Sequence, residues 1–323
     1  MKYIENVCSD AYFNLALEEY IFHHFKDDTY LLLWNNDRSI VLGKNQNVFE
    51  EIITKAVEET GIKVVRRNTG GGTVFHDQGN LNYSFIVDYG PNIFTNYDKF
   101  INPVISALES LGIHASKKGT SDIAIDGKKI SGSAQTTKGG RVLHHGTLLF
   151  DADLSMLHDL LKPPVGKMVS KSVKSARSTV TNIKEHIDDK TMTTDDFQTL
   201  LLNAFFPEGV RKLILSEENL NGIKELVENK YSQWQWNYGN SPNFSYEKES
   251  KISNGLVNVK LDVEKGIVIS CGITIGNLPC KDIETTVIGS QYSYQEIVNK
   301  LVEIKDLVST KNINIEELAS CFF

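Results

Sequence analysis

The stretch RRNTGGGTVFHDQGN, residues 66–80, places two arginines directly before three consecutive glycines. Glycine lets backbone N–H groups approach an anion closely because no Cβ stands in the way, and arginine pairs with phosphate or carboxylate through two parallel hydrogen bonds. The spacing matches neither of the two common phosphate loops, GxGxxG and GxxxxGK[ST], and the residues after the glycines are typical of a strand. Two interpretations stay open: a plain tight turn, or an anion site formed by Arg67 and the glycines.

A lysine follows a predicted tight turn in SDIAIDGKKISGSAQ, residues 121–135. The Asp-Gly pair at its centre suits a two-residue hairpin turn, and apolar residues alternate on both sides of it. A period of two puts Lys129, Ser131 and Ser133 on one face of the returning strand. A lysine held in this way can bind a carboxylate and stabilise charge that develops on a phosphoryl group. The alternative is an ordinary surface lysine on an edge strand, which the adjacent Lys128 keeps open.

Neither the histidines nor the cysteines form a recognisable catalytic or metal-binding set. His144 and His145 are adjacent on a predicted strand, so their side chains point to opposite faces and cannot easily share one ion. His76 has no companion ligands at metal-binding spacing. The four cysteines show no CxxC pattern, and no GxSxG motif is present. We therefore expect hydrogen-bonded or buried histidines and core thiols, as in a protein of the reducing cytoplasm, and the metal ligands are unknown.

Size and charge narrow the class of protein. The chain has 323 residues, of which 41% are hydrophobic and 23% are charged, as is ordinary for a soluble globular protein. Its apolar runs are too short to span a bilayer, and the N-terminus lacks the pattern of a secretion signal, so we expect neither a membrane partner nor export. The formal net charge of −7 does not suggest binding to nucleic acid. Residues 114–177 nevertheless hold eleven Lys or Arg against five Asp or Glu. This local excess suits an anionic ligand, an acidic protein partner or a solvated face.

Helices and strands are expected to alternate around these residues. Asp10 or Ser9 is expected to cap the first helix. Helices are predicted over residues 9–25, 49–60, 97–111, 154–161, 200–206 and 217–230. Strands are predicted for YLLLWNNDRSIVLG (two strands joined by a turn), IKVVRR, TVFH, LNYSFIVD, the hairpin at 121–135, and RVLHHGTLLF.

A shift in composition near residue 244 predicts two domains. WQWNYGNSPNF, residues 234–244, is aromatic and rich in turn residues, and the polar SYEKESKISNG after it is typical of a linker. From Leu256 onward, two strands flank VEKG and a helix covers about residues 294–307. We expect a large domain over residues 1–244 and a small α/β domain over residues 245–323.

Taken in this order and spacing, the motifs resemble those of bacterial lipoate–protein ligases. The resemblance rests on DAYFNLALEEY, RRNTGGGTVFHDQGNLNYSF, SDIAIDGKKISGSAQ, HHGTLLFDADLSML, SARSTVTNI and WQWNYGNSPNF. It covers about the first 245 residues, and the remainder is similar to the accessory domain of the two-domain ligases. The resemblance implies an α/β (α+β) fold, with a large mixed-sheet catalytic domain of the biotin and lipoate ligase type.

The resemblance also implies a two-step reaction. The carboxylate of lipoate attacks the α-phosphorus of ATP, which arrives with Mg²⁺ on its phosphates, and this gives lipoyl-AMP. A lysine of an apo lipoyl domain then takes the lipoyl group. The implied acceptors are acyltransferase subunits of 2-oxoacid dehydrogenases or the H protein of glycine cleavage. Two alternatives stay open: an ATP-independent octanoyl or lipoyl transferase of the same fold, and a non-catalytic lipoate-binding module. The lack of cysteine between Phe13 and Gly266 disfavours a cysteine-dependent transferase.

The resemblance assigns roles to particular residues of this chain. Arg67 is expected to contact phosphate, and Lys129 to contact the lipoyl carbonyl and the adenylate phosphate as the catalytic residue. Asp122 is expected near the nucleotide, and His145 is expected to shape the lipoate pocket. Residues 175–182 are expected to order over the adenylate. The expected lining of the adenylate and lipoyl site consists of Gly72, Thr73, Val74 and Phe75, with His76 nearby.

The chain departs from the family pattern at three places. Some relatives place an aromatic residue and an arginine after SGSA, whereas this chain has Gln and Thr at positions 135–136. Relatives often read GRND where this chain has GTSD, and Thr179 replaces a frequent arginine. One or two phosphate contacts are therefore expected to be missing, or to be supplied by Lys138 or Arg141.

Overall fold

The computed structural model describes residues 1–156, 160–161, 166–175, 178–310 and 313–323. The chain forms two compact units, each of which is built from three segments. The first unit comprises residues 1–44, 63–157 and 176–233, and the second comprises residues 45–62, 158–175 and 234–323. The second unit thus takes two segments that precede its main part at residues 234–323. The boundary at residue 244 stays a prediction.

An eight-stranded sheet is the centre of the first unit. In order across the sheet, the strands are β12 (Lys212–Leu213), β1 (Lys2–Ile4), β2 (Tyr30–Trp34), β6 (Asn80–Asp88), β10 (Arg141–Leu149), β9 (Lys128–Lys138), β8 (Asp122–Ile125) and β7 (Ser116–Lys118). Strand β1 runs parallel to β2 and β12, and the other neighbours are antiparallel. A three-stranded sheet of β4 (Lys63–Arg66), β3 (Ser39–Leu42) and β5 (Val74–His76) completes the unit. The predicted mixed-sheet α/β fold is confirmed.

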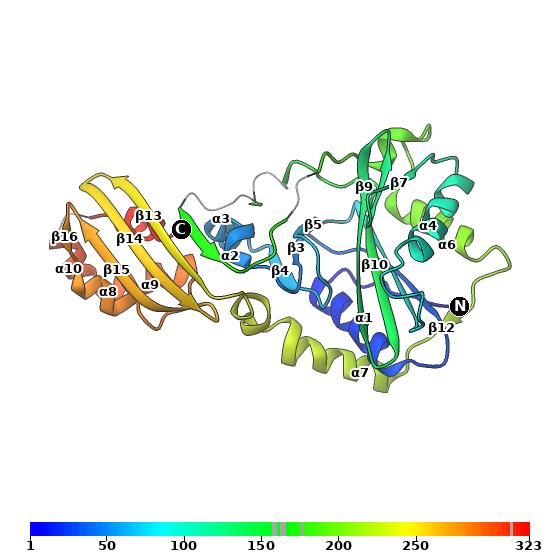
Figure 1. The fold of residues 1–323 in the computed structure, drawn as a ribbon, viewed down its shortest axis with the longest axis horizontal. Helices are drawn as coiled ribbons and strands as arrows, with labels where there is room; N and C mark the ends of the chain where they lie inside the picture. The colour runs from blue at the N-terminus through cyan, green and yellow to red at the C-terminus, as the bar shows by residue number, and fades with distance from the viewer. Residues whose placement is uncertain (157–159, 162–165, 176–177, 311–312) are drawn as a thin grey trace. The chain divides into compact units, whose positions relative to one another are not determined.

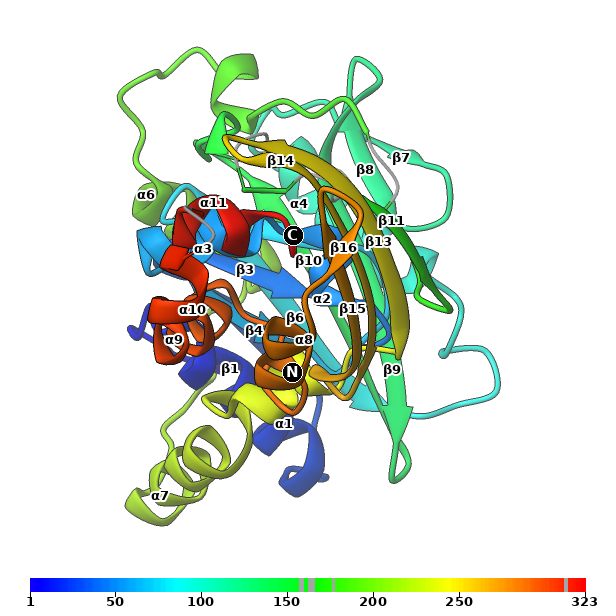
Figure 2. The same ribbon diagram turned by 90° about the vertical axis from the view of Figure 1, so that its left-hand side faces the viewer.

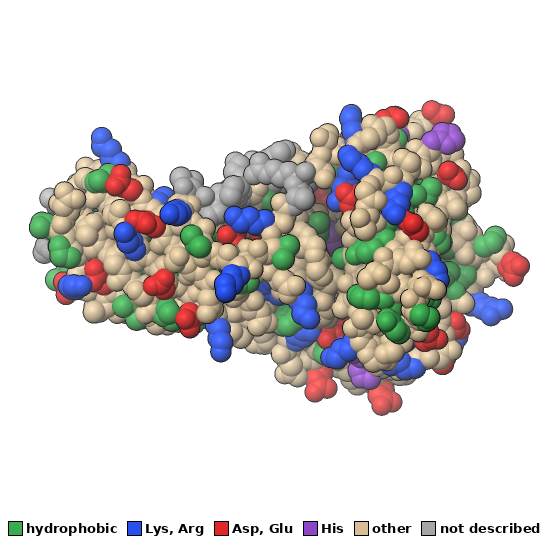
Figure 3. Space-filling view, in the orientation of Figure 1, with side chains coloured by type: hydrophobic (Ala, Val, Ile, Leu, Met, Phe, Trp, Pro, Cys, Tyr) green, Lys and Arg blue, Asp and Glu red, His purple; other side chains and the backbone are tan. Residues whose placement is uncertain are grey.

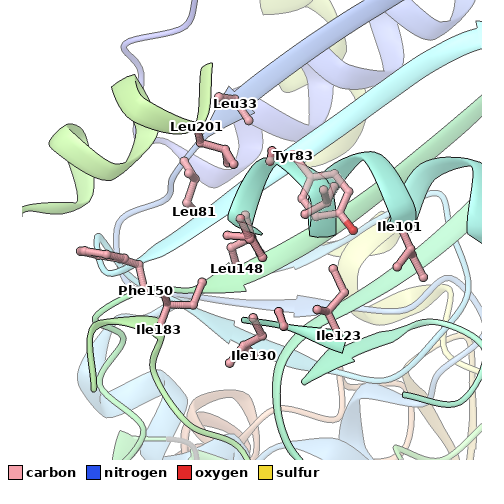
Figure 4. Packing of buried hydrophobic residues seen from close by; sticks show 14 of the residues in the cluster. Leu33, Leu81, Tyr83, Ile101, Ile123, Ile130, Leu148, Phe150, Ile183 and Leu201 are labelled. Atoms are coloured by element: carbon pink, nitrogen blue, oxygen red, sulfur yellow. The ribbon is translucent and has the colours of Figure 1, made fainter. Parts of the chain in front are cut away.

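Helices cover both faces of the large sheet, as Figure 1 shows. Helices α4 (Asp98–Ser110) and α6 (Thr194–Phe205) lie on one face, and their apolar side chains pack with β2, β6 and β10 in a single core. Figure 4 shows Tyr83 of β6 and Leu148 of β10 in the same cluster as Ile101 and Leu201 of these helices. Helix α1 (Ala11–His24) lies on the other face with the small sheet. The face of the sheet that packs against α4 and α6 is therefore an apolar core. Polar side chains lie on the opposite face, toward α1.

Helix α1 begins where the capping pattern predicts. The carboxylate of Asp10 accepts hydrogen bonds from the backbone N–H groups of Tyr12 and Phe13. In the first turn of a helix these N–H groups have no backbone acceptor, so the side chain supplies it. Helix α7 (Glu217–Leu226) packs beside α1, and its Gly222 lies so close to Tyr20 that an added Cβ would stand 2.4 Å from the ring. The predicted helix over residues 217–230 continues from α7 as a wider turn over Val227–Tyr231.

A β-bulge in strand β9 changes which way its lysine points. Ile123 pairs with Ser131, but its successor Ala124 pairs with Lys129, so one extra residue lies in β9. A bulge of this kind turns the strand by one face. Lys129 consequently lies on the face of Gly132, where an added Cβ would stand 2.7 Å from Lys129 Nζ. The prediction that Lys129 shares a face with the two following serines is wrong, because alternation is interrupted between them.

One predicted helix and the predicted linker also differ from the structure. The helix predicted over residues 49–60 is divided into α2 (Val48–Glu51) and α3 (Thr54–Thr60), because the β-branched Ile52 and Ile53 have extended backbone. The polar segment predicted as a linker is strand β13 (Phe244–Ile252). Phe244 and Tyr246 point inward, whereas Glu247, Glu249 and Lys251 are exposed. The strand therefore alternates, although the segment is polar on average. The helix predicted over residues 154–161 lies partly outside the described residues.

The second unit is a curved sheet with helices gathered on one face, as Figure 2 shows. The sheet order is β11 (Lys167–Ser170), β13, β14 (Gly255–Glu264), β15 (Ile267–Ile275) and β16 (Leu278–Pro279). Besides α2 and α3, the helices of this unit are α8 (Lys281–Val287), α9 (Tyr294–Glu303), α10 (Lys305–Thr310) and α11 (Ile315–Ser320). Glu50 of α2 accepts a hydrogen bond of 2.6 Å from Ser170, and Glu51 accepts one of 2.5 Å from Ser175. These contacts fasten the segment of residues 45–62 to the segment that carries β11.

Candidate active site

The triple glycine wraps around a buried guanidinium. Arg67 follows strand β4 and donates through Nη2 to the carbonyl oxygens of Gly70 at 2.7 Å and Gly72 at 2.8 Å. Its Nη1 donates to the carbonyl of Val41 at 3.1 Å. Gly71 has a φ of 91°, and a Cβ there would stand 2.9 Å from Nη2. Glycine is therefore required for the loop to close on the arginine. In this structure Arg67 shapes the loop, and its contact with phosphate stays a prediction.

Arg66 points away from Arg67 and stabilises a different turn. Its side chain is fully buried, and Nη1 donates to the carbonyl oxygens of Gly43 at 3.1 Å and Lys44 at 3.3 Å. Burial lowers the pKa of both guanidinium groups to about 10, so both stay charged near neutral pH. One fixed positive charge thus lies within the glycine loop and a second lies at the neighbouring turn, which favours an anionic ligand in this region.

His145 joins the glycine loop to helix α1. Its Nδ1 lies 2.8 Å from Oε1 of Glu18, and its Nε2 lies 2.7 Å from Oγ1 of Thr69. Thr69 in turn accepts a hydrogen bond of 3.1 Å from Arg67 Nε. Ser84 of β6, which is opposite His145 in the sheet, donates to the same carboxylate at 2.6 Å. All five side chains are buried, so this polar chain orients His145 and leaves it no freedom to turn.

His144 lies on the opposite face, as the strand alternation predicts. Its ring stacks on Phe100 of α4 with centroids 4.5 Å apart, and its Nδ1 lies 2.9 Å from the amide nitrogen of Gln135. His76, on β5, is also buried and contacts Trp34 edge-on at 6.2 Å. Of the three histidines, only His145 and His76 lie on the side of the glycine loop.

Lys129 is held by an ion pair and by its own backbone. Its Nζ lies 3.0 Å from Oδ1 of Asp122, and its side chain is 26% exposed. The backbone N–H of Lys129 donates to the carbonyl of Thr179 at 2.9 Å, and its carbonyl accepts from the N–H of Thr181 at 3.0 Å. The described part of the segment predicted to cover the adenylate, residues 178–182, therefore pairs directly with the lysine. Gly132 leaves room for the lysine side chain to lie across the strand.

The predicted residues come together along one face of β8, β9 and β10. A Cβ on Gly71 would lie 3.9 Å from Ala134, which pairs with His145 across the sheet. Lys129 and Asp122 lie two positions further along the same face, through Gly132. The predicted lining residues Gly72, Thr73, Val74 and Phe75 form the end of the loop and the start of β5, with Phe75 buried. The structure thus places Lys129, Asp122 and His145 on this face, with the glycine loop close to it at Gly71.

Some residues of the site were not predicted from the sequence. These are Glu18, Thr69, Ser84 and Trp34, together with Asn36, whose amide nitrogen lies 3.1 Å from Nδ1 of His76. A carboxylate within the apolar pattern of LALEEY is a signal for Glu18, because a buried charge is retained only with partners. Arg141, suggested as a source of phosphate contacts, is instead buried against the carboxylate of Asp88 and the carbonyls of Asp28 and Ile86.

No group of three or more His, Cys, Asp or Glu side chains that could hold a metal ion occurs among the described residues. Within the same residues, we find no helix with the length and apolar character to cross a membrane. Basic and acidic side chains are interspersed over the face drawn in Figure 3. Among the described residues, Asp122 is the ion-pair partner of Lys129.

The two buried histidines predict how stability depends on pH. Burial lowers the pKa of His76 and His144 from 6.5 to about 3. Between these values the unfolded chain binds two protons that the folded chain does not, so the stability is fully present above pH 6.5 and is lost as the pH falls. We expect the free energy of unfolding to fall by roughly 2.7 kcal/mol per pH unit from these groups between about pH 6 and pH 4.5.

Urea denaturation at several pH values measures this slope. His144→Phe keeps the ring stacked on Phe100 and should reduce the slope by about half, to roughly 1.4 kcal/mol per pH unit. A slope that is the same in the variant and in the unsubstituted chain would show that His144 is protonated in the folded protein.

Comparisons with known proteins agree with this fold. Residues 10–206 match the family model of the lipoyl protein ligase A/B catalytic domain, and residues 241–322 match that of the bacterial lipoate protein ligase C-terminus. Lipoate-protein ligase LplJ of Bacillus subtilis is 42% identical over 310 residues, which cover 93% of each chain. Lipoate–protein ligase 1 of Staphylococcus aureus is 38% identical over 309 residues, which cover 94% of each chain.

Solved structures show the same similarity. A crystal structure of lipoate-protein ligase A bound with ATP is 28% identical, with a TM-score of 0.63 over 74% of this chain and 98% of that one. The bi-partite lipoate protein ligase of Thermoplasma acidophilum is 28% identical, with a TM-score of 0.64 over 74% of this chain and 96% of that one. These matches define a ligase with a catalytic domain and a C-terminal domain. The chain belongs to the lipoate–protein ligase family, and the predictions of this family, of an enzyme and of lipoate ligation are confirmed.

Proposed function

We propose that the chain joins lipoate to protein in two steps on the face that carries Lys129 and the glycine loop. In the first step, a carboxylate oxygen of lipoate bonds to the α-phosphorus of ATP and pyrophosphate leaves. In the second step, the amine of an acceptor lysine bonds to the acyl carbon and AMP leaves. The observation that carries the proposal is the position of Lys129, which is fixed against Asp122 on the same face as the glycine loop and His145.

Lys129 suits the charge that develops in both steps. The ammonium group places a positive charge where negative charge builds first on the α-phosphate and later on the acyl oxygen. Its backbone pairs with residues 179 and 181 and the bulge directs its side chain, so little reorganisation is needed during the reaction. Asp122 keeps the ammonium in place before substrate binds. Mg²⁺ belongs to this scheme as part of the ATP substrate, and its charge would neutralise the departing pyrophosphate.

The glycine loop and His145 suit the two ends of the adenylate. The two buried arginines make the loop electropositive, which favours the phosphoryl group. His145, which is oriented by Glu18 and Thr69, then shapes the acyl side of the site. A Thermoplasma acidophilum protein of the same fold, 28% identical, was solved with lipoic acid, and a lipoate-protein ligase A was solved with ATP. These relatives support both ligands for this chain.

The acceptor is proposed to be an apo lipoyl domain. The Thermoplasma ligase was studied together with its E2 lipoyl domain, which supports a lipoyl domain as partner here. Within the first unit, Lys117, Lys118 and Lys128 are exposed around β7 and β9 and offer a basic surface to an acidic domain. Both an acyltransferase subunit of a 2-oxoacid dehydrogenase and the H protein of glycine cleavage present such a domain.

Mass spectrometry of the acceptor tests the proposal. The chain is incubated with lipoate, ATP, Mg²⁺ and either an apo acyltransferase lipoyl domain or apo H protein. We expect the mass of one lipoyl group on at least one acceptor, and none when ATP is left out. Modification without ATP would instead identify a transferase, and the lack of any modification with either acceptor would identify a lipoate-binding module.

A further inference from the structure

A line of amide side chains begins at the start of helix α1. The side-chain nitrogen of Asn14 donates to the backbone carbonyls of Cys8 at 3.0 Å and Asn35 at 2.9 Å. Its side-chain oxygen accepts a hydrogen bond of 2.7 Å from Asn6, whose own oxygen accepts from the backbone N–H of Cys8 at 3.1 Å. Because backbone carbonyls only accept and a backbone N–H only donates, the orientation of the Asn14 amide is determined.

The orientation of the Asn14 amide determines that of the Asn36 amide. The nitrogen of Asn14 also lies 2.9 Å from Oδ1 of Asn36. The two hydrogens of the Asn14 NH₂ group are thus shared among three acceptors. If the Asn36 amide were reversed, two NH₂ groups would face each other at this distance, and the buried NH₂ of Asn36 would lose its acceptor at a cost of about 1–3 kcal/mol. Asn36 therefore accepts through Oδ1 and presents its NH₂ group to His76, whose Nδ1 lies 3.1 Å away.

The amide of Asn36 in turn selects one tautomer of His76. A neutral imidazole carries its proton on one nitrogen, and the other nitrogen is an acceptor. Since Nδ1 accepts from Asn36, the proton resides on Nε2. Burial and the neighbouring charge of Arg67 keep the ring neutral, because they lower the pKa of His76 to about 3. His76 is consequently a neutral N–H donor through Nε2 over the whole physiological pH range.

The Nε2 donor has no acceptor among the residues that the structure describes. The atom is buried, and the side chain of His76 is 3% exposed. A buried N–H group without a partner is rare in native proteins, and it is expected where a ligand supplies the acceptor. The ring is held edge-on against Trp34 and lies near Arg67 and His145, so the donor belongs to the same site as the glycine loop.

We propose that Asn14 and Asn36 are positioning residues, which set His76 as an Nε2–H donor to an oxygen of the acyl or phosphoryl group of the substrate. This use of the donor rests on the proposed ligation, whereas the tautomer itself does not. A neutral donor suits a place beside Arg67, because it adds a hydrogen bond without a second positive charge. Because the neutral His76 ring keeps its proton on Nε2, it donates the same hydrogen bond to the substrate oxygen in both steps of the reaction.

Nitrogen NMR of ¹⁵N-histidine-labelled protein tests the tautomer without any substrate. The signals of His76 are assigned by their loss in His76→Gln. We expect the Nε2–H tautomer from pH 5.5 to pH 8.5, with no titration. In Asn36→Asp the neighbour only accepts, so Nδ1 must become protonated. An Nδ1–H tautomer in the unsubstituted chain, or no change in Asn36→Asp, would overturn the proposal.

Kinetics and binding test what the donor contacts. His76→Gln keeps an N–H near the place of Nε2, and we expect it to retain more activity than His76→Leu, which should lose about 10- to 100-fold in kcat/KM for lipoate. Weaker binding of lipoate without ATP in His76→Leu would assign the carboxylate oxygen as acceptor. Unchanged lipoate binding with slower pyrophosphate release would assign the phosphoryl oxygen.

Equal binding and equal rates in all folded variants would overturn the substrate contact. Circular dichroism and urea denaturation identify which variants are folded. If His76→Leu is unfolded, the comparison is made with His76→Gln. The Nε2–H tautomer in a chain that never lipoylates any acceptor would contradict the proposed function alone. The two failures are therefore distinguishable.

Discussion

Replacing Lys129 with alanine is expected to slow the formation of lipoyl-AMP by about 10²–10³-fold, the typical loss for one preorganised electrostatic donor. The side chain is the positive group that the bulge of β9 directs across Gly132 toward Asp122. Its removal leaves the carboxylate of Asp122 facing the substrate phosphates, which adds repulsion to the lost attraction. Pyrophosphate release with lipoate and ATP, without an acceptor, measures this step.

Lys128→Ala is the matched control, because Lys128 is adjacent in the chain, has the same charge and is exposed. We expect its rate to stay within about twofold of the unsubstituted chain, as is usual for a surface substitution. If both variants release pyrophosphate as fast as the unsubstituted chain, Lys129 is not the catalytic residue.

Replacing Gly132 with alanine is expected to displace Lys129 without unfolding the protein. The added Cβ would stand 2.7 Å from Nζ and 2.9 Å from Cε of Lys129, both closer than van der Waals contact allows. The end of a lysine side chain is flexible, so it moves in preference to the backbone. Since a displacement of about 1 Å in an active site can cost on the order of 10²-fold in rate, we expect kcat to fall at least tenfold.

Gly272→Ala is the control for this substitution. Gly272 also lies within a strand, β15, and an added Cβ there meets nothing within 4 Å. Both variants should unfold at nearly the same urea concentration, and only Gly132→Ala should be slow. If Gly132→Ala is fully active, the position of Lys129 on this face is wrong.

Local patterns in the sequence predict most of the strands and helices of the first unit. The cap at Asp10 and the turn at Asp126 and Gly127, where φ is 49° and 75°, depend on residues that are close in sequence. Such features can be read from a few neighbouring residues. The same holds for the opposite directions of His144 and His145, which follow from the geometry of any strand.

The site depends on contacts that no local pattern contains. Glu18 and His145 are 127 positions apart and meet only because α1 packs on the face of β10. The bulge in β9 shifts Lys129 by one face although the alternation of residue types continues through it. The polar strand β13 was predicted as a linker since its inward residues, Phe244 and Tyr246, are outnumbered by exposed polar ones. In each case the missing information is which face another element covers.

The resemblance to a family supplied the roles of the site residues, and the geometry adds how they are held. Arg67 illustrates the difference. The resemblance implies a contact with phosphate, whereas the structure shows a guanidinium that already donates to Val41, Gly70 and Gly72. The geometry therefore supports a second contribution for Arg67, which is to hold the glycine loop in shape. Its buried positive charge would at the same time attract an anionic ligand at the loop.

The central claim is that the chain activates lipoate as an adenylate before any acceptor is present. The most direct measurement mixes the chain with lipoate and α-³²P-labelled ATP and Mg²⁺, without acceptor, and separates the bound products by chromatography. We predict about one equivalent of labelled lipoyl-AMP per chain and an equal amount of pyrophosphate. A chain that lipoylates an acceptor under the same conditions but forms neither product without it would contradict the account.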